Sequence, residues 1–430
     1  MTDRLAPVAL ALVPLVLGLA LPPAAFAQAD LRGTWDGAWG KSADTLAVTM
    51  RFEESAEGWS GSFESERLRV EGIPFTDVAF ETPDVTIRMV GDATTMVFTG
   101  TVKGDSLTGT LEEDGKLGWF AFGRIARVEP ARHEEAVRFR NGDVELAGTL
   151  LLPAGPGPHP AVVFMHGSGP EGRWASNYLS RRVVEGGTAA LIWDKRGVGE
   201  SAGSWEAASF EDQAGDVAAA VAILRSRPEI DPNRVGIHGH SQGGTIAPLA
   251  AVRSNADFVI GSAASGLPMD DVEVYSIGNF VGIPSMSGEE ARLARAYVEA
   301  LVDVAYHGAP RDSLDAIVER ARGREWFFEP PAADDSYWVF SRRIADYDPL
   351  VWWSQVDVPV LLVYGSEDER VPVEPSVEAI TGALESSGHS ATVRIFEGAD
   401  HTFRVRRPGD EWPRTVSGYP DAVIDWLASL

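Results

Sequence analysis

The chain has 430 residues, 44% of them hydrophobic and 9% aromatic, so it is long enough for two domains and too apolar for a disordered protein. Its formal net charge of −26 argues against nucleic acid and anionic membranes as partners, because both repel an acidic surface. With no cysteine in the sequence, disulfides, thiolate catalysis and cysteine-ligated metals are excluded.

The first 27 residues have the pattern of a secretory signal peptide. Arg4 provides a weak positive start, an apolar run extends over residues 5–20, and Ala-Phe-Ala at 25–27 forms a small-residue cleavage site. A membrane anchor is the alternative, but the apolar run is short for a membrane span and contains Pro14. We therefore expect cleavage after Ala27, a secreted or periplasmic protein, and no stable membrane insertion.

Residues 28–130 have the alternating pattern of an all-β domain. Apolar and polar residues alternate in short runs, separated by turn residues, and these runs are 46–52, 85–89, 96–98 and 107–111. Closely spaced short strands predict a small sandwich or an up-and-down barrel. We expect a packing or oligomerisation module, with binding of a ligand such as a glycan as the alternative. Exposed sheet edges in such a domain favour a homodimer.

From residue 131 to 430 the pattern changes to alternating strands and helices. The predicted strands are 136–140, 144–152, 161–165, 188–193, 234–238, 258–262, 358–364 and 392–396. The predicted helices are 177–185, 210–225, 242–252, 374–386 and 420–429. Strands that are continuous apolar runs between helices indicate an α/β domain with a mostly parallel, doubly wound sheet covered on both faces.

Residues 266–350 interrupt this alternation. They contain helical patterns at 289–305 and 314–322 and a dense set of aromatic residues, which are Trp326, Phe327, Phe328, Tyr337, Trp338 and Phe340. An insertion at this point of an α/β sheet lies over the strand ends, where ligands bind. We therefore expect a helical cap whose aromatic residues partly form its own core and partly face the ligand.

The sequence Gly-His-Ser-Gln-Gly at 239–243 fits the Gly-x-Ser-x-Gly pattern of a nucleophile elbow. A predicted strand ends just before it and a predicted helix begins just after it, as an elbow requires. Glycines flank the serine because larger side chains would collide in so tight a turn. The turn also directs the N-terminus of the helix at a developing oxyanion. Ser241 is therefore the candidate nucleophile, and an ordinary glycine-rich turn is the alternative.

A serine hydroxyl needs a base, and the base needs a carboxylate. Of the eight histidines, His401 lies just past the carboxyl end of the last predicted strand, at the edge where the nucleophile stands. Asp368 follows strand 358–364 at the same edge, with Glu367 as its closest competitor. Their order along the chain, serine then aspartate then histidine, is that of α/β-hydrolases.

An oxyanion formed during acyl transfer needs two backbone N–H donors. By position, Gln242 supplies one of them, and Ser168, in the loop after strand 161–165, supplies the other. We expect His166 to hold that loop and the charged loop 194–201 to brace the same edge of the sheet.

Five motifs together resemble bacterial α/β-hydrolases: His-Gly-Ser-Gly at 166–169, Asp-Lys-Arg-Gly-Val-Gly-Glu-Ser at 194–201, Gly-His-Ser-Gln-Gly at 239–243, Gly-Ser-Glu-Asp at 365–368 and Gly-Ala-Asp-His at 398–401. The chain from about residue 134 is similar to esterases and to dienelactone-hydrolase and dipeptidyl-peptidase-like proteins. A preceding β domain resembles that of some secreted bacterial esterases. The resemblance implies hydrolysis of esters or thioesters, without metal or cofactor. We expect the substrates to be small-molecule carboxylic esters of short to medium acyl chains. Ser241 departs from the cysteine usual in dienelactone hydrolases.

Two other functions stay open at this point. A serine peptidase of the prolyl-oligopeptidase or dipeptidyl-peptidase type usually carries a propeller, but residues 30–128 are too short for one and show no blade repeat. A non-catalytic binding protein on a hydrolase scaffold is the third possibility. The complete set of Ser241, Asp368 and His401 argues against it, because such proteins have generally lost one member of the set.

Overall fold

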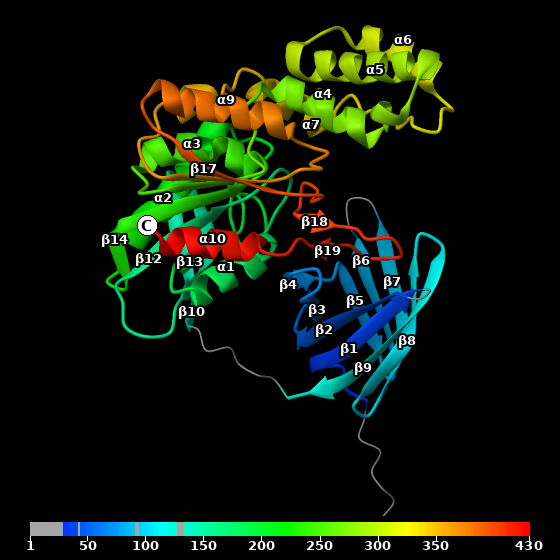
Figure 1. The fold of residues 1–430 in the computed structure, drawn as a ribbon. Helices are drawn as coiled ribbons and strands as arrows, with labels where there is room; N and C mark the ends of the chain where they lie inside the picture. The colour runs from blue at the N-terminus through cyan, green and yellow to red at the C-terminus, as the bar shows by residue number, and fades with distance from the viewer. Residues whose placement is uncertain (1–28, 42–43, 91–93, 127–132) are drawn as a thin grey trace, which may run out of the picture.

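The computed structural model describes residues 29–41, 44–90, 94–126 and 133–430. The signal peptide expected at residues 1–27 lies outside the described residues. The described chain forms an antiparallel β domain, followed by an α/β domain that carries a group of helices at one end (Figure 1). In these described ranges, no helix combines the length and the apolar character needed to cross a membrane.

Within the described residues, the β domain is one antiparallel sheet in the order β4-β3-β2-β1-β9-β8-β7-β6-β5. The sheet curls back on itself, since Trp59 of β3 and Phe80 of β5 meet edge to face with ring centroids 5.3 Å apart. Trp35 and Trp39 are fully buried inside it. The strands are β1 (Gly33–Lys41), β2 (Asp44–Ser55), β3 (Gly58–Ser65), β4 (Val70–Pro74), β5 (Asp77–Glu81), β6 (Asp84–Val90), β7 (Thr95–Lys103), β8 (Ser106–Glu113) and β9 (Lys116–Ile125).

One side chain of the α/β domain completes the core of the β domain. Trp412 follows the short strand β18 (Arg404–Val405) and precedes its partner β19 (Arg414–Thr415). Its ring is buried with the apolar side chains of the β domain, and the Lys41 ammonium lies 4.8 Å from the ring centroid. Figure 1 shows β18 and β19 between the two domains. The two domains therefore share packed apolar surface.

The sheet of the α/β domain has the order β10-β11-β13-β12-β14-β15-β16-β17. The pairs from β13 to β17 along this order are parallel, whereas β11 pairs antiparallel with both β10 and β13. Every residue of β13, β15 and β16 is buried. The strands are β10 (His133–Asn141), β11 (Val144–Leu152), β12 (His159–Met165), β13 (Ala189–Trp193), β14 (Ile230–His240), β15 (Val259–Ser262), β16 (Val360–Gly365) and β17 (Ala391–Phe396).

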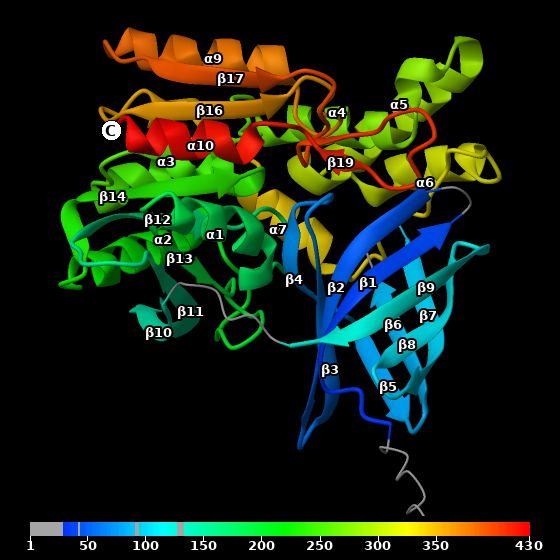
Figure 2. The same cartoon turned by 60° about the horizontal axis from the view of Figure 1, so that its bottom comes forward.

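Helices cover both faces of this sheet, which is why its central strands are apolar throughout (Figure 2). Helices α1 (Asn177–Glu185) and α10 (Tyr419–Ala428) pack on one face. The other face is covered by α2 (Phe210–Arg225), α3 (Gln242–Ser254), α8 (Leu350–Trp353) and α9 (Val373–Ser386).

Between β15 and α8 the chain leaves the sheet and forms a separate group of helices. These are α4 (Met269–Phe280), α5 (Gly288–Val302), α6 (Arg311–Ala321) and α7 (Ser336–Ile344), with a π-helical turn at Asp303–His307. The group has its own apolar core, which includes Tyr297, Leu301 and Leu314. Figure 1 shows the four helices together at one end of the α/β domain. We call residues 269–344 the helical insertion.

Candidate active site

Ser241 stands at the junction of β14 and α3 in a strained backbone conformation, with φ 56° and ψ −122°. Its N–H donates to the carbonyl oxygen of Ser262 at 2.9 Å, which ties the turn to β15. A Cβ on Gly239 would lie 2.2 Å from the carbonyl oxygen of Gly243, and a Cβ on Gly243 would lie 2.4 Å from that of His166. The glycines beside the serine are therefore required by close backbone contacts.

His401 connects Ser241 to Asp368. Its Nε2 lies 2.9 Å from Ser241 Oγ, and its Nδ1 lies 2.9 Å from each carboxylate oxygen of Asp368. The imidazole and the carboxylate are both buried. With Nδ1 donating its proton to the carboxylate, the lone pair of Nε2 accepts the hydroxyl of Ser241. The structure thus brings together the three residues that the sequence singled out.

Asp368, and not its neighbours, is the carboxylate that contacts the ring of His401. Its Oδ1 also accepts the N–H groups of Arg370 and Val371, both at 2.8 Å, which fixes the carboxylate in place. Glu369 accepts the backbone N–H of His401 at 3.2 Å. The side chain of Glu367 is exposed to solvent. The competitor that the sequence left open therefore makes no contact with the imidazole.

Three further histidines around the elbow are kept neutral by burial, which lowers the pKa of His240 to about 4 and those of His238 and His166 to about 3. His240 donates from Nε2 to the carbonyl oxygen of His401 at 3.1 Å. His166 donates from Nε2 to the carbonyl oxygen of Trp193, as expected of a loop-holding residue. The contact between His240 and His401 was missed, because adjacency to Ser241 in the sequence does not reveal it.

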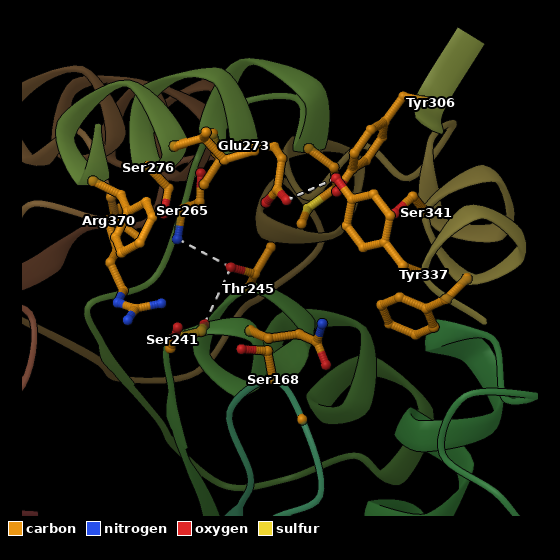
Figure 3. Close-up of a pocket in the computed structure, with 18 of the residues that line it drawn as sticks. Ser168, Ser241, Thr245, Ser265, Glu273, Ser276, Tyr306, Tyr337, Ser341 and Arg370 are labelled. Carbon is orange, nitrogen blue, oxygen red and sulfur yellow. Dashed lines mark hydrogen bonds between the residues drawn. The ribbon is translucent and has the colours of Figure 1, made fainter. Parts of the chain in front are cut away.

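Ser168 and Gln242 line the same cavity as Ser241 (Figure 3). In the part of the chain that the structure describes, neither of their backbone N–H groups has a hydrogen-bond partner. The loop that holds Ser168 is fixed by Lys195, whose Nζ donates to the carbonyl oxygens of Gly167 at 2.7 Å and Gly169 at 3.1 Å. Burial lowers the pKa of Lys195 to about 8. Both N–H groups are thus free to donate to an oxyanion.

A cavity of about 870 Å³ opens above Ser241, between the edge of the sheet and helices α4 and α7 (Figure 3). Of the aromatic residues expected in the insertion, Tyr337 and Phe340 line it, together with Trp205 and Tyr306. The other expected aromatic residues pack against the core of the insertion, and these are Trp326, Phe327, Phe328 and Trp338. Across the described ranges, no group of three or more His, Asp or Glu side chains is arranged to hold a metal ion.

Two family models match separate parts of the α/β domain. Residues 156–301 match the family described as serine aminopeptidase, S33, and residues 348–429 match the dienelactone hydrolase family. The first match contains Ser168, Ser241 and Gln242, and the second contains Asp368 and His401. The two matches therefore cover all five residues that the sequence analysis assigned to the site.

Two curated proteins each resemble about two thirds of the chain. Esterase EstD of Thermotoga maritima is 30% identical over 307 residues, which are 68% of this chain and 67% of that protein. The quorum-quenching protein AidA of Acinetobacter baumannii is 36% identical over 294 residues, which are 65% of this chain and 91% of that protein. Among solved structures, an esterase of Pyrococcus furiosus superposes with a TM-score of 0.46 at 16% identity, covering 71% of this chain and 94% of its own.

Proposed function

Because the chain belongs to the α/β-hydrolase esterases of the dienelactone-hydrolase-like branch, we propose that it cleaves small-molecule carboxylic esters with Ser241, His401 and Asp368 as its catalytic triad. One observation carries the proposal. Ser241 Oγ, the His401 ring and the Asp368 carboxylate form a continuous hydrogen-bonded series at 2.9 Å per contact, below a cavity large enough for a small ester.

In the first half of the reaction, Ser241 Oγ attacks the ester carbonyl carbon while His401 Nε2 takes the hydroxyl proton. Asp368 keeps Nδ1 protonated and stabilises the imidazolium that forms. The carbonyl oxygen becomes an oxyanion and accepts the N–H groups of Ser168 and Gln242. The bond to the alcohol oxygen then breaks, the alcohol leaves with the proton from His401, and the acyl group stays on Ser241.

In the second half, a water molecule takes the place of the alcohol. His401 removes its proton, and the resulting nucleophile attacks the acyl carbon, with the same two N–H groups holding the oxyanion. The carboxylic acid leaves and Ser241 recovers its proton from His401. The helical insertion serves as a cap that limits the acyl chain to short or medium length, because α4 and α7 form the far wall of the cavity.

Peptide hydrolysis is the second candidate, since residues 156–301 match the serine aminopeptidase family. The same triad can cleave an amide, and only the relative rates separate the two activities. Against the peptidase stands the small β domain, which has the wrong strand number for a propeller. A non-catalytic binding role would not explain why Ser241 has a strained backbone and why the triad is complete.

The cellular setting belongs to the proposal as well. An apolar run and an Ala-Phe-Ala site at residues 25–27 support export and removal of the first 27 residues, giving a secreted or periplasmic esterase.

We keep the homodimer as part of the proposal, because the β domain has two sheet edges, β4 and β5. Size-exclusion chromatography with light scattering tests the dimer, and fractionation of expressing cells tests export.

Hydrolysis of p-nitrophenyl esters from acetyl to decanoyl tests the reaction itself, with p-nitroanilides of the same acids as the amide arm. The expected result is ester turnover that is highest for short or medium acyl chains and far slower anilide cleavage. Faster cleavage of the anilides would replace the esterase by the peptidase. Ester turnover that is equal in the wild type and in the Ser241→Ala variant would overturn the assignment of the nucleophile.

A further inference from the structure

Glu273 is a carboxyl group that the proposed mechanism does not use, although it lies in the same cavity as Ser241. It projects from α4 of the helical insertion into the space above Thr245, across the cavity from Ser241 (Figure 3). The phenol of Tyr337 donates to its Oε1 at 3.1 Å. The residue is half-buried, and this burial raises the pKa of its carboxyl group.

Within the described residues, Glu273 forms no ion pair within 4.0 Å, and its second oxygen, Oε2, accepts no hydrogen bond. The one basic side chain that lines the cavity is Arg370, which acts on Glu273 only at a distance and lies closer to Glu369, with Nε 4.0 Å from Oε1. A half-buried carboxylate with a free oxygen gains from a cation that comes within hydrogen-bonding distance. Oε2 of Glu273 is therefore available to a group that enters the cavity.

The walls around Glu273 favour a cation over an anion. The other carboxyl groups that line the cavity are Glu206, Asp335 and Glu369, against the single guanidinium of Arg370. Aromatic rings stand beside them, since Tyr306, Tyr337, Phe340 and Trp205 line the same space. An ammonium group gains from carboxylate oxygens and from the faces of aromatic rings alike. Tyr306 belongs to the π-helical turn Asp303–His307, a type of turn that often occurs at functional sites.

We propose that Glu273 binds a protonated primary amine of the substrate, so that the preferred substrates are esters that carry an ammonium group away from the scissile carbonyl. This inference rests on the proposed function for its reaction but not for its binding site. One N–H of the ammonium group donates to Glu273 Oε2, and the phenol of Tyr337 holds Oε1. The aromatic rings of the helical insertion enclose the methylene groups next to the nitrogen.

Calorimetric titration of the Ser241→Ala variant tests the site without any turnover. The probes are n-hexylammonium and n-hexanol at pH 7, which have the same length and differ in charge. The expected Kd for hexylammonium is at least about tenfold lower than that for hexanol, as one charge-assisted hydrogen bond provides. Adding Glu273→Gln removes this preference, whereas adding Asp271→Asn, which deletes an exposed charge on the same helix, preserves it. Equal binding of the two probes, or loss of the preference in both variants, would overturn the proposal.

Two further measurements separate this proposal from the esterase itself. The Glu273→Asp variant keeps a carboxylate, so it should retain part of the preference even if Glu273→Gln folds poorly. In the enzyme with Ser241 intact, kcat/KM for p-nitrophenyl ε-aminocaproate should exceed that for p-nitrophenyl heptanoate, a neutral ester of equal length. Preferential ammonium binding without hydrolysis of either ester would refute the proposed function alone. Hydrolysis of both esters with no preference for the charged one would refute the ammonium site alone.

Discussion

Arg67 of the β domain donates to the backbone carbonyl oxygen of Trp412 at 2.7 Å, and so joins that domain to the segment that follows His401. The same guanidinium binds both oxygens of Asp44, whose Oδ2 accepts the N–H of Glu411 at 2.8 Å. On the far side, the N–H of Val416 donates to the carbonyl oxygen of Phe403 at 2.8 Å. The loop that carries the histidine is thus fastened to the β domain.

The Trp412→Ala variant should lose both stability and turnover. A buried tryptophan replaced by alanine costs about 3–5 kcal/mol, and here the cavity falls between the two domains. Loosening residues 404–416 also frees the loop of His401, so kcat should fall more than KM rises. Thermal unfolding and steady-state kinetics check this, with Trp412→Phe as the matched control that keeps the ring. Full kcat in Trp412→Ala would show that the β domain does not support the histidine.

The Asp368→Asn variant should lower kcat by a factor on the order of 10³–10⁴, because an amide no longer fixes the tautomer of His401 or stabilises its protonated form. The fold should survive, since asparagine has the same shape and its carbonyl oxygen can still accept the N–H groups of Arg370 and Val371. Steady-state hydrolysis of p-nitrophenyl butyrate measures the loss. Glu367→Gln is the control, and a comparable loss there would move the carboxylate role to Glu367.

Replacing glycine with alanine should reduce activity at Gly243 and increase stability at Gly382. A Cβ on Gly243 would lie 2.4 Å from the carbonyl oxygen of His166, so Gly243→Ala must displace the loop that presents Ser168 and should reduce kcat strongly. Gly382 lies inside α9 with nothing within 4 Å of the added Cβ. Gly382→Ala should therefore stabilise the protein by about 0.5–1 kcal/mol and leave turnover unchanged. Kinetics and chemical denaturation check the pair, and an active Gly243→Ala enzyme would contradict the tight elbow.

The buried histidines should make the protein sensitive to acid. Burial holds the pKa of His238 at about 3 and that of His240 at about 4, below the 6.5 of an unfolded chain. The unfolded state therefore binds more protons than the folded state below pH ~6.5, and the free energy of unfolding should fall as pH drops from there towards ~4. Each histidine contributes a slope of up to about 1.4 kcal/mol per pH unit.

Denaturant titrations between pH 7 and pH 4.5 test this slope. The His238→Gln variant removes one of the titrating groups, so its free energy of unfolding should depend less steeply on pH than that of the wild type. His389→Gln is the control, because His389 lies partly exposed in the loop between α9 and β17. An unchanged pH dependence in His238→Gln would mean that this histidine titrates alike in the folded and unfolded states.

Much of the α/β domain follows from local sequence patterns. The ranges predicted for the strand 144–152 and the helices 177–185 and 210–225 coincide with β11, α1 and α2, because buried apolar runs and amphipathic helices leave clear periodicities. The predicted family is confirmed by the curated relatives. Helix α4 was not predicted, since its polar and apolar residues face a cavity on one side and the insertion core on the other, which weakens its period.

Contacts between segments that are distant in the chain could not be predicted from the sequence. The hydrogen bond from Tyr337 to Glu273 spans 64 residues, and that from Arg67 to Trp412 spans 345. No local sequence pattern identifies Glu273 as a cavity residue or Trp412 as part of the core of the other domain. Both depend on how the helical insertion and the β18–β19 hairpin fold back over the rest of the chain. The triad residues could be chosen from sequence because each lies within a few residues of the carboxyl end of a recognisable strand.

Labelling with a fluorophosphonate, followed by mass spectrometry of the digested protein, tests the central claim most directly. The reagent reacts covalently with an activated serine, and it needs no knowledge of the natural substrate. We predict one phosphonyl group per chain on the peptide that contains Ser241, no labelling in Ser241→Ala, and much slower labelling in His401→Gln. An unlabelled wild-type protein, or a label on another residue that persists in Ser241→Ala, would contradict the account.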